Sequence, residues 1–148
     1  MVSTSGSHLL PESAISTLIE KLLPLTTILT PNLPEAELLL KVAGVIVEHP
    51  QNFDDVVSMA KRIQQLGPKY VLLKGGHLPL TKGHLVSKTE EEREIVLNVL
   101  VSKDEVITMK SEYLRSKNTH GTGCSLACKF PRICFEFKMV MLGSCNRV

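Results

Sequence analysis

Residues 70–77 read Tyr-Val-Leu-Leu-Lys-Gly-Gly-His, and this stretch decides the fold class. Its first four residues form a continuous apolar run of the kind that is buried on both faces of a parallel sheet. Gly67 and Pro68, just before the run, end any preceding helix. The run therefore predicts a central strand, and Lys74 then lies at the carboxyl edge of the sheet, where open α/β folds bind ligands.

Amino-terminal to this strand, the sequence alternates helical and extended patterns. Apolar residues at helical spacing predict helices over residues 11–23, 34–44 and 54–66. Between the first two helices, residues 26–30 form a short β-branched run that is typical of a buried strand. Pro24 separates this run from the first helix, because proline cannot continue a helical hydrogen-bond ladder.

Carboxy-terminal to the strand, residues 95–101 and 105–109 predict two more strands, joined by a turn at Lys103-Asp104 as a hairpin. Strands alternating with helices indicate an α/β domain. We therefore expect a mainly parallel sheet flanked by helices.

A second informative stretch follows these strands. Residues 118–127 read Asn-Thr-His-Gly-Thr-Gly-Cys-Ser-Leu-Ala. Two glycines before a helix start allow several backbone N–H groups to converge, and the positive end of the helix dipole favours an anion such as phosphate there. Glycine spacing alone favours the simpler interpretation that the turn only caps a helix.

Length and composition limit the classes of function. A chain of 148 residues with 43% hydrophobic residues fits one globular domain. Its charge is 17 − 15 = +2, without long blocks of either sign, which gives no electrostatic reason for binding nucleic acid or a membrane. No apolar run approaches the roughly 20 residues of a membrane helix, and no secretory leader is evident, so we expect a cytoplasmic protein. The four cysteines match neither a disulfide framework nor a zinc site.

Four segments in this order, residues 2–6, 30–38, 71–77 and the glycine-rich run, resemble one family. They are similar to the C-terminal half of hydroxymethylpyrimidine and phosphomethylpyrimidine kinases, the thiamine-biosynthesis enzymes of the ribokinase-like superfamily. The resemblance implies a partial ribokinase-like fold over residues 1–127. It stops at residues 128–148, which we expect to form a divergent tail, and the family's N-terminal substrate-binding half has no counterpart in the sequence.

The resemblance assigns roles to the glycine-rich run. Gly121, Thr122 and Gly123 would form an anion hole for the phosphoryl group, with Thr122 among the nucleotide-binding residues. Cys124 would be the catalytic thiol. Because a helix N-terminus lowers the pKa of a thiol, Cys124 could accept or relay the proton of the acceptor hydroxyl. Without the resemblance, Cys124 is better interpreted as an inert, partly buried thiol.

The resemblance also assigns the other site residues. Lys74, Asn32, Gly75 and Gly76 would contact the nucleotide, and Glu35 would organise Mg²⁺ with its waters. Considered alone, Asn32 and Glu35 indicate a helix cap with an acidic first turn, and both interpretations can hold together. A lysine at a strand end is otherwise usually a solvated charge.

The implied function is ATP- and Mg²⁺-dependent phosphoryl transfer to hydroxymethylpyrimidine or its monophosphate, so the expected partners are ATP and a small pyrimidine. Two alternatives stay open. One is a non-catalytic, truncated remnant that folds poorly or pairs with a full-length relative, and a homo-oligomer is a further open partner. The other is a pyridoxal-kinase-like enzyme, against which Cys124 and residues 30–36 argue.

Overall fold

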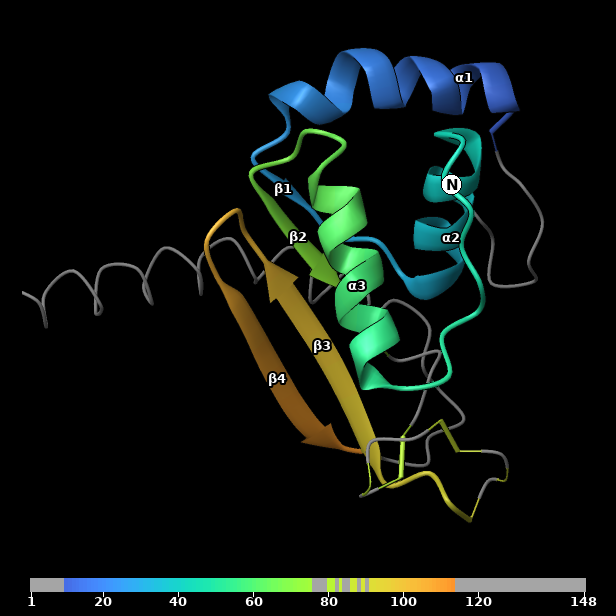
Figure 1. Ribbon diagram of the computed structural model, residues 1–148, viewed down its shortest axis with the longest axis vertical. Helices are drawn as coiled ribbons and strands as arrows, with labels where there is room; N and C mark the ends of the chain where they lie inside the picture. Colours follow the sequence, from blue (N-terminus) through green and yellow to red (C-terminus); the bar gives the residue numbers. More distant parts are fainter. Residues whose placement is uncertain are drawn as a thin grey trace, which may run out of the picture. The chain divides into compact units, whose positions relative to one another are not determined.

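The computed structural model describes residues 10–75, 80, 81, 83, 86, 87, 89 and 91–113 (Figure 1). The chain separates into two compact units, Met1–Leu114 and Arg115–Val148, and the described residues all belong to the first. The predicted boundary between residues 127 and 128 lies outside the described residues and stays a prediction.

The first helical segment changes its winding along its length. It comprises α1 (Glu12–Thr17), the π-helical turn η1 (Leu18–Leu22) and the 3₁₀ turn η2 (Leu23–Leu25). The helix predicted over residues 11–23 is confirmed in position, but its final turns are not α-helical. Pro24 explains the tighter last turn, because its ring clashes with a carbonyl four residues earlier and it donates no N–H.

Two capped helices follow. Helix α2 spans Leu33–Val42 and helix α3 spans Phe53–Gln64, so both predicted helices are confirmed to within about two residues at each end. Each begins with a capping box, built from Asn32 and Glu35 in α2 and from an equivalent Asn-Asp pair in α3. After α2 the chain turns at Gly44, whose φ of 76° suits glycine.

Within the described residues, the sheet has four strands in the order β1-β2-β3-β4. The strands are β1 (Ile28–Leu29), β2 (Tyr70–Leu73), β3 (Ile95–Val101) and β4 (Val106–Glu112). The β1–β2 pair is parallel, whereas β2–β3 and β3–β4 are antiparallel.

The described sheet is therefore mixed, whereas the sequence indicated a mainly parallel one; the α/β class is confirmed. The connections give the physical reason. Helices α2 and α3 form the crossover that a parallel β1–β2 pair needs. The predicted hairpin is confirmed: Ser102 N donates to Glu105 O (2.9 Å), and so short a turn forces β3 and β4 to run antiparallel.

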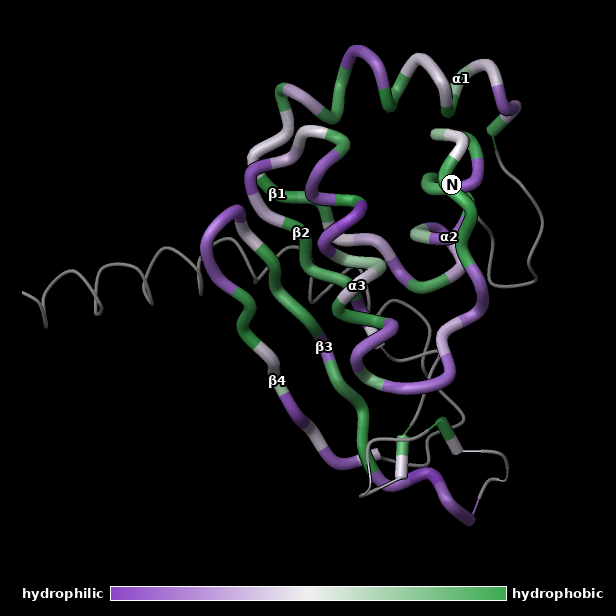
Figure 2. Tube along the Cα trace, in the orientation of Figure 1, coloured by the Kyte–Doolittle hydropathy of each residue, from purple (hydrophilic) through white to green (hydrophobic). Residues whose placement is uncertain are grey.

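The main core lies between α3, α2 and one face of the sheet. Strand β3 alternates along its length, with Ile95, Leu97, Val99 and Val101 buried on the side of α3. Figure 2 shows that β2 and β3 are mostly apolar, whereas β4 is more polar. A second, smaller cluster of Ile15, Leu38 and Leu39 packs the first helical segment against α2. Among the described residues, no helix is both long enough and apolar enough to span a membrane.

Candidate functional site

Lys74 follows β2 directly and lies beside the residues that follow β1. Its backbone N–H donates to Pro31 O (2.9 Å), and Asn32 and Lys74 form a parallel β-bridge. The two strands are parallel, so their carboxyl ends meet at one edge of the sheet. The structure thus confirms that Lys74 lies at the carboxyl edge of the sheet, and it places Asn32 beside it.

Asn32 and Glu35 are held to each other by two hydrogen bonds. Asn32 Oδ1 accepts from Glu35 N (2.9 Å), and Glu35 Oε2 accepts from Asn32 N (3.0 Å). The helix-cap interpretation of this pair is therefore confirmed, and it fixes the Glu35 carboxylate at the carboxyl edge. The cap uses Oδ1 of Asn32, which leaves Nδ2 as the atom that can donate to a ligand oxygen.

Gly75 is buried where β2 approaches β3 closely. A Cβ atom built at this position would lie 1.8 Å from Leu97 O, so no side chain fits there. The backbone N–H of Gly75 donates to Asn98 Oδ1 (3.1 Å). Packing alone thus requires a glycine at position 75, and the nucleotide contact expected of Gly75 stays a prediction.

Asn98 was missed by the sequence reasoning. It is the single polar side chain in the β3 sequence Ile-Val-Leu-Asn-Val-Leu-Val, and it is half-buried. An amide side chain inside an apolar strand needs a hydrogen-bond partner, and this is the signal that could have pointed to it.

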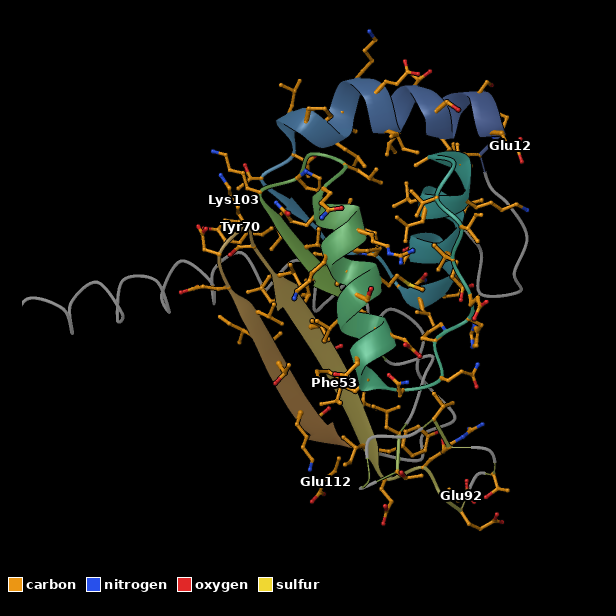
Figure 3. All side chains as sticks on the ribbon, viewed as in Figure 1. Glu12, Phe53, Tyr70, Glu92, Lys103 and Glu112 are labelled. Carbon is orange, nitrogen blue, oxygen red and sulfur yellow. The ribbon has the colours of Figure 1, made fainter. Side chains whose placement is uncertain are left out.

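The open end of the β3–β4 hairpin, away from its turn, also lies at the carboxyl edge of the sheet. Ile95 pairs with Glu112, on the side of β3 towards which β2 runs. Just beyond, Arg93 Nη1 donates to Tyr113 Oη (3.3 Å), and the guanidinium carbon lies 5.8 Å from the centroid of the tyrosine ring. In Figure 3, Glu112 and Lys103 mark the two ends of the hairpin, and Lys103 is at the far end from Lys74.

The donor chemistry at the carboxyl edge fits magnesium with few protein ligands. In the part of the chain that the structure describes, no group of three or more His, Cys, Asp or Glu side chains could hold a metal ion. Glu35 supplies one carboxylate at this edge. Magnesium usually keeps several waters and takes one or two carboxylates besides substrate phosphates, so a single fixed carboxylate is compatible with it.

A hollow of about 330 Å³ lies elsewhere, beside α3 and the segment that joins α2 to α3. It contains none of the predicted site residues. Its lining includes Ile46, Glu48, His49, Ser58 and Arg62. The remaining predicted site residues lie outside the described residues, and their roles stay predictions: Gly76, Gly121, Thr122, Gly123 and Cys124.

Comparison with known proteins identifies a family over most of the chain. Residues 1–130 match the model of a family described as phosphomethylpyrimidine kinase. A putative hydroxymethylpyrimidine/phosphomethylpyrimidine kinase of Schizosaccharomyces pombe is 41% identical over 127 residues, which are 86% of this chain and 23% of that protein.

Two solved structures resemble the chain in fold. A phosphomethylpyrimidine kinase from Clostridium difficile is 39% identical, with a TM-score of 0.54 over 75% of this chain and 39% of that one. An ADP complex of a Bacillus subtilis pyridoxal kinase is 30% identical, with a TM-score of 0.63 over 85% of this chain and 41% of that one. The chain thus spans well under half the length of these proteins.

Proposed function

Because this chain belongs to the phosphomethylpyrimidine kinase family, we propose that it forms the nucleotide-phosphate and magnesium part of an ATP-dependent kinase. The acceptor would be hydroxymethylpyrimidine or its monophosphate, in thiamine biosynthesis. The observation that carries the proposal is the bridge between Asn32 and Lys74, because it brings a cation and the capped Glu35 carboxylate to one edge of the sheet.

The three described side chains supply complementary chemistry. The Lys74 ammonium binds phosphate oxygens of ATP, and Asn32 Nδ2 donates to the same group. Glu35 orients the waters of Mg²⁺ while the capping hydrogen bond holds its carboxylate. When bound, magnesium neutralises charge on the phosphates. Phosphoryl transfer depends mainly on such positioning and charge neutralisation, so this set suits the reaction.

The family resemblance extends the proposal to the glycine-rich run at residues 118–127, which lies outside the described residues. Backbone amides of Gly121, Thr122 and Gly123 would bind the transferred phosphoryl group, and Gly75 and Gly76 would line the path of the nucleotide. Cys124 would take the proton of the acceptor hydroxyl.

Two competing proposals are distinguishable by experiment. The first is that the chain is non-catalytic and acts by pairing with itself or with a full-length relative. The second is a pyridoxal-type acceptor, which the likeness to the Bacillus subtilis pyridoxal kinase favours. Against it stand Cys124 and the Thr-Pro-Asn-Leu-Pro-Glu-Ala run at residues 30–36, both of which match the pyrimidine kinases.

A coupled assay of ADP release tests which acceptor, if any, the isolated chain phosphorylates. The purified chain is supplied with Mg²⁺-ATP and, in separate reactions, with hydroxymethylpyrimidine, its monophosphate, pyridoxal or no acceptor. Because the chain spans only part of its relatives, we expect Mg²⁺-ATP binding but no acceptor-dependent ADP release. Release that depends on a pyrimidine would show that the chain builds its own acceptor pocket, and release that depends on pyridoxal would reject the pyrimidine assignment.

A graft tests the catalytic assignment. The part of a full-length relative that has no counterpart here is joined before Met1, and a regular helix from that relative replaces residues after Ala127. We expect this chimera to recover pyrimidine-dependent turnover. Cys124→Ala in the chimera should lower kcat more than it weakens ATP binding if the thiol moves a proton. Equal losses in both quantities would instead indicate that Cys124 only shapes the turn.

A further inference from the structure

We propose that Asn98 is a positioning residue that fixes the backbone on which Lys74 is carried. The proposal rests on the proposed binding of nucleotide phosphate by Lys74. Its structural basis is the hydrogen bond from Gly75 N to Asn98 Oδ1 (3.1 Å), together with the contacts that hold the same backbone from the other side.

The β2–β3 ladder ends just before Lys74. Its pairs run from Val71–Val101 to Leu73–Val99, and no ladder pair includes Lys74 or Gly75. The Lys74 N–H faces away from β3 and continues the β1–β2 pairing, because it donates to Pro31 O just as Tyr70 N donates to Thr27 O. The next N–H, that of Gly75, would lose its partner in the ladder, and the Asn98 side chain supplies the acceptor in place of a β3 carbonyl.

The donor fixes which atom of the amide is involved. Because the Gly75 N–H is the donor, Asn98 must present Oδ1 rather than Nδ2 to it. The Gly75 backbone also lies close to β3, because a Cβ built there would be 1.8 Å from Leu97 O. The backbone at residues 74–75 is thus attached to both neighbouring strands, and this preorganises the start of the Lys74 side chain.

Packing does not explain an amide at position 98. The buried side chains of β3, at 95, 97, 99 and 101, face the helical layer, and Asn98 alternates to the other face with Val96 and Leu100. Both of those neighbours are apolar, so an apolar residue at 98 would fit the strand as well. An apolar residue at position 98 could not accept a hydrogen bond from the Gly75 N–H. The Lys74 side chain has many rotamers, so a fixed backbone at its base lowers the entropy cost of binding phosphate.

Amide hydrogen exchange tests the clamp itself on the full 148-residue chain. In the wild type the Gly75 N–H should exchange slowly. In Asn98→Ala it should exchange roughly tenfold faster, which matches the loss of one net hydrogen bond. Asn98→Asp keeps an acceptor oxygen at the same distance along the side chain and should restore slow exchange. The control Leu100→Ala shortens a side chain on the same face of β3 and should leave Gly75 protection, relative to its neighbours, unchanged.

Nucleotide binding tests the positioning role by a double-mutant cycle. Asn98→Ala should weaken Mg²⁺-ATP binding about 3- to 10-fold in the Lys74 background but have little effect in Lys74→Ala. Equal weakening in both backgrounds, or a Gly75 exchange rate that Asn98→Ala does not change, overturns the proposal. If the wild-type chain binds no Mg²⁺-ATP, the proposed function and the role of Asn98 in it both fail, and the exchange data then report only on the structural clamp.

Discussion

Replacing Gly75 by alanine is the sharpest test of how the carboxyl edge is built. The new Cβ would lie 1.8 Å from Leu97 O and 2.9 Å from Leu97 C, and contacts under 3.0 Å are essentially never seen for a real Cβ. The two backbones must therefore separate by at least 3.0 − 1.8 = 1.2 Å. Leu97 O is a backbone atom of β3, so no side-chain rotation can relieve the clash.

The energetic cost follows from what this separation breaks. Moving Gly75 away from β3 by that amount stretches its 3.1 Å hydrogen bond to Asn98 beyond bonding distance. One lost hydrogen bond costs about 0.5–1.5 kcal/mol, and overpacking a tight site costs about 1–3 kcal/mol. We expect the free energy of unfolding to fall by roughly 2–4 kcal/mol, a large part of the ~5–15 kcal/mol of an ordinary domain.

Urea unfolding followed by circular dichroism measures this loss, because the chain has no tryptophan for fluorescence. Gly83→Ala is the matched control: the nearest atom to its Cβ is Thr81 Oγ1 at 3.6 Å, an ordinary contact. We expect that variant to stay within about 0.5 kcal/mol of the wild type. If Gly75→Ala proves as stable as Gly83→Ala, the close approach of β2 to β3 and the argument built on it are wrong.

Three further predictions concern the helix cap, the cation and the core. Asn32→Ala and Asn52→Ala each remove a capping acceptor and should each lower the free energy of unfolding by ~1 kcal/mol in urea titrations, but only Asn32→Ala should also weaken Mg²⁺-ATP binding. Lys74→Ala should cost about 1–3 kcal/mol of Mg²⁺-ATP binding by calorimetry, whereas Lys103→Ala, at the far end of the hairpin, should change it little; equal affinities would make Lys74 a mere surface charge. Ile63→Ala empties a fully buried site and should cost ~2–5 kcal/mol of stability, and a near-neutral result would contradict the placement of α3 on the sheet.

Strong local signals explain how far the sequence predicted this fold. The strands at 70–73 and 95–101 and the hairpin turn were found because apolar runs bounded by turn residues identify them without tertiary information. The helices at 33–42 and 53–64 were found because apolar spacing and cap residues agree.

Strand direction was harder to predict because it depends on connections. Outside the predicted hairpin, the continuous apolar run at residues 70–73 suggested a mainly parallel sheet, yet such a run shows only that both faces of a strand are covered. The direction of β3 relative to β2 is set by the path of the chain between them, and no local pattern in residues 74–94 encodes it. The π and 3₁₀ turns before Thr26 likewise depend on how one proline is accommodated.

At the candidate site, sequence reasoning placed Lys74, Asn32 and Glu35 at the ends of their elements and missed Asn98. Lys74, Asn32 and Glu35 stand next to punctuating glycine or proline residues, so their positions at element ends were readable. Asn98 lies in the middle of a strand, and its use becomes clear only when the register brings it next to Gly75. A polar residue inside an apolar strand is a weak signal until its partner is known.

Gly75 is required for packing, and its neighbour Lys74 is the residue proposed to bind phosphate. Because the two are consecutive, binding data on variants at these positions must be interpreted with care for the shared backbone. Gly75 is required by the contact with Leu97 O, so any substitution there disturbs the backbone that carries Lys74. Loss of nucleotide binding in Gly75→Ala would therefore not identify a contact between Gly75 and the nucleotide. Lys74→Ala is different, because its side chain is outside the buried core and its backbone hydrogen bond to Pro31 O survives the change. Only variants that change binding without changing stability can assign phosphate contacts at this edge, and Lys74→Ala is the first of them.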